Sequence, residues 1–257
     1  MRTRFFIFSL LFLVPSLGQS AMTKPEMISL LEQLDERQSN SGDYKALAYI
    51  EQKERDKTDL VYEAVIYRRD IQDKLMILFT RPKAEAGKGY LRIDKNLFMY
   101  DPTVGKWERR TERERIGGTN SQRSDFDESR LAKEFEPTYV GQEKLGKFAV
   151  HHLKLEAKKD ADVAFPVIEM WIDVKTSNVL KQQERALSGR LMRTSYYPKW
   201  NKIYSESKGA DIYFPKEIRI FDEIEKGKKT LIVMRKVDLR NLDANIFTKA
   251  WLESKSR

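Results

Sequence analysis

The strongest constraint on the fold of this chain is a series of short segments in which apolar and polar residues alternate. In residues 167–174, with the sequence VIEMWIDV, the side chains of Ile168, Met170 and Ile172 would share one face of a strand. Two further strand-like segments follow, each after a short turn containing Ser with Asn or Gly. Three successive strands joined by tight turns predict an antiparallel meander.

The same pattern extends over most of the chain. Strands are predicted at residues 60–69, 74–81, 89–94, 96–100 and 106–110, and a C-terminal hairpin at 217–225 and 229–239. Amphipathic helices are predicted only near the ends, at 23–38 and 246–253. We therefore expect a mainly β protein: one large curved antiparallel sheet, an incomplete or half β-barrel, with an N-terminal helix and short lid helices over its concave face.

The amino terminus has the pattern of a secretory signal peptide. Arg2 and Arg4 precede a short apolar run and a small-residue exit, and the run is too short to span a bilayer. We expect a signal peptide at 1–21, a single soluble domain at 22–257, and a periplasmic location. The chain has no cysteine, so its core alone must hold the fold in an oxidising compartment.

Charge gives a weak indication of partners. The chain has 48 basic and 39 acidic residues, a formal net charge of +9, which loss of Arg2 and Arg4 would lower to about +7. This favours anionic partners such as lipid headgroups. The charges are interleaved, as in KWERRTERERI, and no nucleic-acid-binding module is recognisable, so nucleic acid is not expected as a partner.

Residues typical of catalysis are scarce. The only histidines, His151 and His152, are adjacent and would point to opposite faces of a strand, so they predict no shared metal site. The acidic pairs Asp125/Asp127 and Asp222/Glu223 could in principle form a glycosidase couple, but nothing marks out either pair. We therefore predict no enzymatic activity, no catalytic residue, no metal and no cofactor.

The stretch GGTNSQRSDFDESRL, residues 117–131, allows three interpretations. A phosphate-binding loop is disfavoured, because no lysine follows Gly118 and the surrounding strands are not arranged as a βαβ unit. The stretch can instead be a connection into a capped helix, with Phe126 and Leu131 facing inward. It can also be the hinge of a mobile lid at Gly117 and Gly118. The residues alone favour neither of the last two.

Several short motifs, in their order and spacing, resemble the outer-membrane lipoprotein-sorting (LolA-like) family, in particular the branch often encoded beside resistance–nodulation–division (RND) exporters. The motifs are Arg81-Pro82, Lys88-Gly89-Tyr90-Leu91, Leu97-Phe98-Met99-Tyr100-Asp101-Pro102, Ser124-Asp125-Phe126, Gly227-Lys228-Lys229-Thr230, Val237-Asp238-Leu239 and Ile246-Phe247-Thr248. With the signal peptide and the first helix, the resemblance covers nearly the whole chain. It implies an incomplete barrel closed by a helical lid over a cavity for acyl chains.

The resemblance implies a non-catalytic periplasmic carrier or binding protein for a lipid or lipoprotein acyl chain, with an inner-membrane RND-type exporter or an outer-membrane acceptor as further partners. It favours the hinge at Gly117 and Gly118. The predicted lipid-binding residues are Leu91, Ile93, Phe126, Leu131, Ile168, Met170 and Ile172. A competing hypothesis is an accessory or regulatory protein that docks on such an exporter or on a signalling partner without lipid transfer.

Overall fold

The computed structural model describes residues 21–94, 96–111 and 113–256, so the predicted signal peptide lies outside the described residues except for Ala21. The strands are β1 (Asp43–Lys53), β2 (Leu60–Arg69), β3 (Lys74–Arg81), β4 (Gly89–Ile93), β5 (Asn96–Asp101), β6 (Lys106–Arg110), β7 (Phe135–Leu145), β8 (Phe148–Ala157), β9 (Val167–Asp173), β10 (Val179–Arg185), β11 (Leu191–Ser205), β12 (Ala210–Asp222) and β13 (Lys229–Asp238). The α-helices are α1 (Lys24–Gln38), α2 (Leu131–Glu134) and α3 (Lys249–Lys255), and the 3-10 helices are η1 (Asp70–Gln72), η2 (Ile116–Gly118), η3 (Arg123–Asp125) and η4 (Ala244–Phe247).

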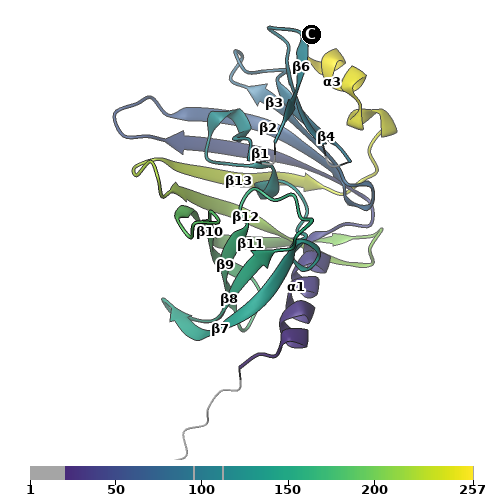
Figure 1. The fold of residues 1–257 in the computed structure, drawn as a ribbon. Coiled ribbons are helices and arrows are strands. Elements are labelled where there is room, and N and C mark those ends of the chain that lie inside the picture. Colours follow the sequence, from purple (N-terminus) through teal and green to yellow (C-terminus); the bar gives the residue numbers. More distant parts are fainter. Residues whose placement is uncertain (1–20, 95, 112, 257) are drawn as a thin grey trace, which may run out of the picture.

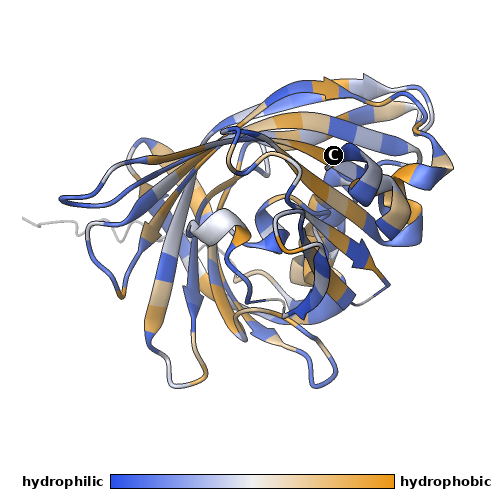
Figure 2. Ribbon diagram, turned by 90° about the horizontal axis from the view of Figure 1, so that it is seen from above, coloured by the Kyte–Doolittle hydropathy of each residue, from blue (hydrophilic) through white to orange (hydrophobic). Residues whose placement is uncertain are grey.

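The strands form one sheet with the order β6-β5-β4-β3-β2-β1-β13-β12-β11-β10-β9-β8-β7 (Figure 1). Paired strands are antiparallel, and the edge strands β6 and β7 do not pair with each other. The first and last strands, β1 and β13, pair in the middle of the sheet. Seen from above, the sheet bends into an incomplete ring (Figure 2). The predicted curved, open antiparallel sheet is therefore confirmed.

Helix α1 covers one end of the concave face. Its N-terminus is fixed by the Glu26 carboxylate, which accepts hydrogen bonds from the backbone N–H and the hydroxyl of Thr23, each at 2.7 Å. Leu31 and Leu34 are fully buried in a cluster with the inward residues of β8 and β9. The helix predicted at 23–38 is thus present, and its apolar stripe faces the sheet.

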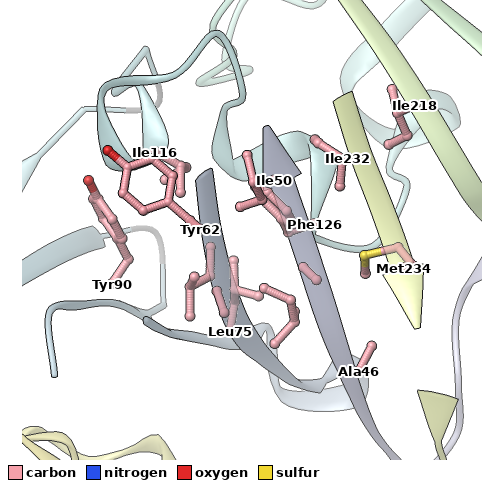
Figure 3. Packing of buried hydrophobic residues seen from close by; sticks show 14 of the residues in the cluster. Ala46, Ile50, Tyr62, Leu75, Tyr90, Ile116, Phe126, Ile218, Ile232 and Met234 are labelled. Carbon is pink, nitrogen blue, oxygen red and sulfur yellow. The ribbon is translucent and has the colours of Figure 1, made fainter. Parts of the chain in front are cut away.

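A connection between the two edge strands crosses the concave face. We call residues 113–134 the crossing segment; it contains η2, η3 and α2. Ile116 and Phe126 from this segment are buried in one cluster with sheet residues that include Ile50 and Ile232 (Figure 3). The capped helix considered for the stretch 117–131 begins only at its last residue: a 3-10 turn occupies 123–125, and the α-helix starts at Leu131.

The C-terminal elements lie on the opposite, convex face. Figure 1 shows α3 beside the β3 and β4 end of the sheet. η4 and α3 pack against the outward residues of β2, β3 and β4, so that Phe247 and Leu252 are buried with Met76 and Leu91. Such a second cluster is needed because the outward positions of these strands are also apolar. None of the helices in the described residues is long and apolar enough to cross a membrane.

Candidate functional site

An internal cavity of about 160 Å³ lies between the crossing segment and the concave face of the sheet. Its apolar lining comes mainly from the inward positions of the strands, among them Ile168, Met170, Val179, Phe214 and Ile218. Residues 163–165 of the loop between β8 and β9 cover another side. Because these side chains alternate with outward polar residues, the regular strands of the sheet are what collect them at one place.

The structure brings together four of the seven residues predicted to bind lipid. Ile168 and Met170 line the cavity from β9, and Phe126 and Leu131 line it from the crossing segment. Ile172 is fully buried in the adjoining cluster beneath α1 and does not line the cavity.

Leu91 and Ile93 lie on the other side of the sheet. Both belong to the convex cluster under α3, whereas Tyr90 and Arg92 face the concave side. The side chains of β4 are large on both faces, so the sequence did not show which alternate set points inward. We therefore leave Leu91 and Ile93 out of the candidate site.

Gly117 and Gly118 adopt positive φ angles of 61° and 71° and turn the chain into the concave side. A side chain at Gly117 would meet the ring of Phe79 at 3.1 Å, whereas nothing lies within 4 Å of a Cβ built at Gly118. Glycine is suited to both positions because other residues rarely adopt this left-handed conformation. Neither glycine lines the cavity.

Two buried ionic networks, which the sequence analysis missed, fasten the crossing segment to the sheet. In the first, Arg193 of β11 donates to both carboxylate oxygens of Asp125, at 2.8 and 2.9 Å, and also pairs with Glu184 of β10. Arg193 also donates to the backbone carbonyl of Asn120 at 3.0 Å. Burial lowers the pKa of Arg193, but the two carboxylates outweigh this effect and raise the pKa well above its usual range.

The second network is centred on Asp127, which is surrounded by arginines. Its carboxylate pairs with Arg123 and lies 3.4 Å from Arg92 and 3.5 Å from Arg130. Arg68 of β2 donates to the Asp127 backbone carbonyl at 3.3 Å. Burial raises the pKa of Asp127, but the arginines more than offset this and hold the pKa below its usual value.

A third attachment joins α2 to α1. The Asp35 carboxylate accepts hydrogen bonds from the backbone N–H groups of Leu131, at 2.9 Å, and Ala132, at 2.8 Å, and from the Ser129 hydroxyl at 2.6 Å. These N–H groups begin a helix and have no partner within it, so a carboxylate from a neighbouring helix serves as their cap. Burial raises the pKa of Asp35, although these hydrogen bonds oppose the shift.

The acidic pairs weighed as a glycosidase couple have other partners. Asp125 and Asp127 are held by the two separate arginine networks. Asp222 accepts from two backbone N–H groups and pairs with Arg115. Glu223 accepts a hydrogen bond from the Thr194 hydroxyl. In the described part of the chain, no group of three or more His, Cys, Asp or Glu residues is placed to hold a metal ion. The cavity offers apolar surface beside ion pairs that are already satisfied.

An open antiparallel sheet crossed by one segment above an internal cavity defines the LolA-like class of folds. A LolA superfamily protein from Nitrosomonas europaea is 21% identical with a TM-score of 0.74, over 87% of this chain and 97% of that one. A domain described as outer membrane lipoprotein-sorting, from Vibrio parahaemolyticus, is 16% identical with a TM-score of 0.73, over 88% and 97%. A DUF1329 family protein from Desulfovibrio piger is 18% identical with a TM-score of 0.77, over 89% and 98%.

The TM-scores and coverages establish a shared fold. A family model with the description "Uncharacterized protein"-like matches residues 71–254, and the chain belongs to that family. No curated protein matches the sequence. None of the three structural relatives is described as an exporter component, so the exporter-associated branch stays a prediction.

Proposed function

We propose that the protein is a non-catalytic periplasmic carrier that binds an acyl chain of a lipid or lipoprotein in the cavity beneath the crossing segment. The observation that carries this proposal is the apolar concave lining, with Ile168 and Met170 on one side and Phe126 on the other, in a LolA-like sheet. The relative from Vibrio parahaemolyticus is described as outer membrane lipoprotein-sorting, which supports the same class of cargo.

The driving force is the removal of hydrocarbon from water. Burial of an acyl chain contributes about 0.8 kcal/mol per methylene. The polar residues around the cavity are paired with one another, as in Arg193 with Asp125 and Glu184, so they offer no unpaired charge to a ligand headgroup. The proposed cargo therefore inserts its tail and leaves its headgroup towards the solvent.

The cavity must enlarge to accept that tail. Its volume of about 160 Å³ matches the roughly 150 Å³ of a site that holds a benzene-sized molecule, while pockets for larger ligands measure about 300–1,000 Å³. Phe126, with 1% of its surface exposed, occupies the adjoining space. We propose that the crossing segment turns about Gly117 and Gly118 and withdraws Phe126, as a lid would.

The first experiment asks whether the exported protein contains a ligand. The protein is purified from the periplasm under gentle conditions, its mass is determined, and an organic extract is analysed by mass spectrometry. We expect about one acyl-chain lipid per protein. An extract without lipid, together with failure to bind a fluorescent fatty acid, would refute the carrier proposal.

A pair of variants tests the position of the site. Val163 lines the cavity from the β8–β9 loop and is half-buried, whereas its neighbour Asp162 is exposed and does not line it. Val163→Trp should block the fluorescent fatty acid and lower its affinity at least tenfold, while Asp162→Trp should bind like the parent. Equal binding by both variants would place the ligand elsewhere.

A further inference from the structure

A second hollow lies on the convex face, where β11, β12 and the β12–β13 turn meet. This groove has a volume of about 460 Å³ and is lined by Tyr196, Phe221 and residues of the turn. The rings of Tyr196 and Phe221 pack edge to face, with centroids 5.8 Å apart. They remain 39% and 38% exposed, and Ile224 in the adjoining β12–β13 turn is 37% exposed. Aromatic and aliphatic side chains are therefore left open to solvent at one place.

The acidic groups of this groove are already engaged. Asp222 accepts from the backbone N–H groups of Ile224, at 2.9 Å, and Glu225, at 2.8 Å, and pairs with Arg115. Glu223 accepts from the Thr194 hydroxyl at 2.5 Å. Asp222 thus has an ion-pair partner, whereas Glu223 is held by a hydroxyl and keeps one negative charge at the groove.

The lysines of the groove are divided between paired and free groups. Lys228 pairs with Glu225 and, at 3.5 Å, with Glu54. Among the described residues, Lys226 and Lys229 have no ion-pair partner. Lys229 belongs to the Gly227-Lys228-Lys229-Thr230 motif and Lys226 directly precedes it, and the proposed carrier function uses neither lysine. Two unpaired lysines face the single unpaired carboxylate of Glu223, so the net free charge of the groove is positive.

The side-chain types indicate what this surface fits. Lysine presents a compact charge on a flexible stem, whereas directed binding of a single carboxylate or phosphate is better served by the planar fork of arginine. Lysines beside exposed tyrosine, phenylalanine and isoleucine match the composition of surfaces that lie at a membrane interface, with the rings at headgroup depth and the ammonium groups on anionic phosphates. The net positive charge of the whole chain acts in the same direction.

We propose that the groove formed by Tyr196, Phe221 and the turn with Lys226 and Lys229 docks the protein on the surface of an anionic phospholipid bilayer. This contact needs neither the internal cavity nor a bound acyl chain, so it stands or falls separately from the carrier function. It is reversible, because each lysine contributes only modestly and salt screens the attraction.

The test is binding to vesicles in the absence of any fatty acid. The exported protein, with processing confirmed by mass, is sedimented with vesicles of phosphatidylcholine alone or of phosphatidylcholine with phosphatidylglycerol. We expect binding to the anionic vesicles that falls as salt is raised, and little binding to the neutral ones. Equal binding to both vesicle types would overturn the proposal.

Variants locate the contact. The double change Lys226→Gln and Lys229→Gln should weaken partitioning about thirtyfold. The matched control is Lys147→Gln with Lys175→Gln, two exposed lysines in turns at the opposite ends of the strands, which removes the same net charge. The control should retain most of the parent's binding, and an equal loss in both doubles would mean that total charge, not the groove, is responsible.

A third variant examines the apolar part of the groove without altering charge. Phe221→Ser should weaken vesicle binding severalfold at high salt, where the contribution of the lysines is screened. Circular dichroism verifies that each variant is folded. If no variant or parent binds vesicles but the parent binds polyglutamate, the groove serves an acidic polymer or protein and the membrane assignment is wrong.

Discussion

Arg193, Asp125 and Glu184 form an ion triad in which each side chain is at most 5% exposed. Moving three charges out of water costs free energy, so the triad stabilises the fold only when all three side chains stay paired. Asp125 belongs to the crossing segment, while the other two belong to the sheet. The triad therefore selects one position of the crossing segment over others.

Removal of the arginine should be far more damaging than removal of a surface arginine. Arg193→Met leaves two buried carboxylates unpaired and is expected to cost about 3–5 kcal/mol in unfolding free energy. Arg219 is exposed, and its partner Glu217 also pairs with Lys199, so Arg219→Met should cost about 1 kcal/mol or less. Urea unfolding measures both. Similar losses in the two variants would show that the triad does not fasten the segment.

Glu128 predicts a dependence of stability on pH. Burial, helped by Asp70 and Asp73 and opposed by Arg130, raises the pKa of Glu128 from 4.5 to about 7. The folded protein then binds more protons than the unfolded chain between these values, so the contribution of this group to stability declines as pH rises from about 4.5 to 7. Glu128→Gln should remove that decline.

Thermal unfolding of the parent and Glu128→Gln between pH 5 and 8 provides the measurement. The difference in melting temperature between the two should shift in favour of the variant as pH rises. A constant difference across this range would mean that Glu128 titrates in the folded protein as it does in the unfolded chain.

The cavity has two covers, the crossing segment and the β8–β9 loop, and they are attached differently. The crossing segment is fastened by the two arginine networks and by Asp35. The β8–β9 loop, residues 158–166, is hydrogen-bonded at its base, where Lys158 donates to the carbonyls of Glu134 and Ala132. Val163 and Phe165, which reach the cavity, are half-buried. The loop is the more weakly held cover.

This difference predicts unequal effects of truncating the two phenylalanines. Phe126→Ala should cost about 3–5 kcal/mol, because the ring is fully buried. Phe165→Ala should cost clearly less, yet accelerate the exchange of a bound fluorescent fatty acid. Urea unfolding and stopped-flow exchange test the pair. Faster exchange in Phe126→Ala alone would mean that the β8–β9 loop does not limit exchange and that the crossing segment is the cover that opens.

The sequence predicted elements with strong local patterns well. The alternation at Ile168, Met170 and Ile172 correctly gave both a strand and its buried face, and the spacing of Leu31 and Leu34 gave α1. The long hairpin of β11 and β12 was predicted only in part. Its middle is rich in lysine and tyrosine, and bulges interrupt its register, so the alternation is broken there.

Contacts between distant residues could not be predicted from one sequence. Arg193 lies 68 residues from Asp125, and either residue alone resembles any of the many surface charges of this chain. The placement of Leu91 failed for a related reason: which face of β4 is concave depends on where α3 packs. The local pattern of residues determines where strands form. When both faces of a strand are apolar, tertiary packing determines which face points inward.

For the molecule as a whole, the two faces of the sheet should be separable by mutation. Leu252→Ala opens the convex cluster under α3, and Met170→Ala opens the lining of the cavity; each should cost about 2–5 kcal/mol. Only Met170→Ala should change the affinity for the fluorescent fatty acid. Urea unfolding and a binding titration give both quantities, and a comparable change in affinity for Leu252→Ala would contradict a site confined to the concave face.

The pairing of β1 with β13 has a consequence for the order of folding. Each half of the chain, β1 to β6 and β7 to β13, is a succession of local hairpins that can zip up independently. The seam between the halves is the pairing of β1 with β13, which joins residues as far apart as Lys45 and Asp238. Among the strand pairings of the sheet, this one therefore requires the largest loss of chain entropy. We expect the seam to acquire protection last in pulsed hydrogen exchange during refolding; early protection of β1 and β13 would refute this order.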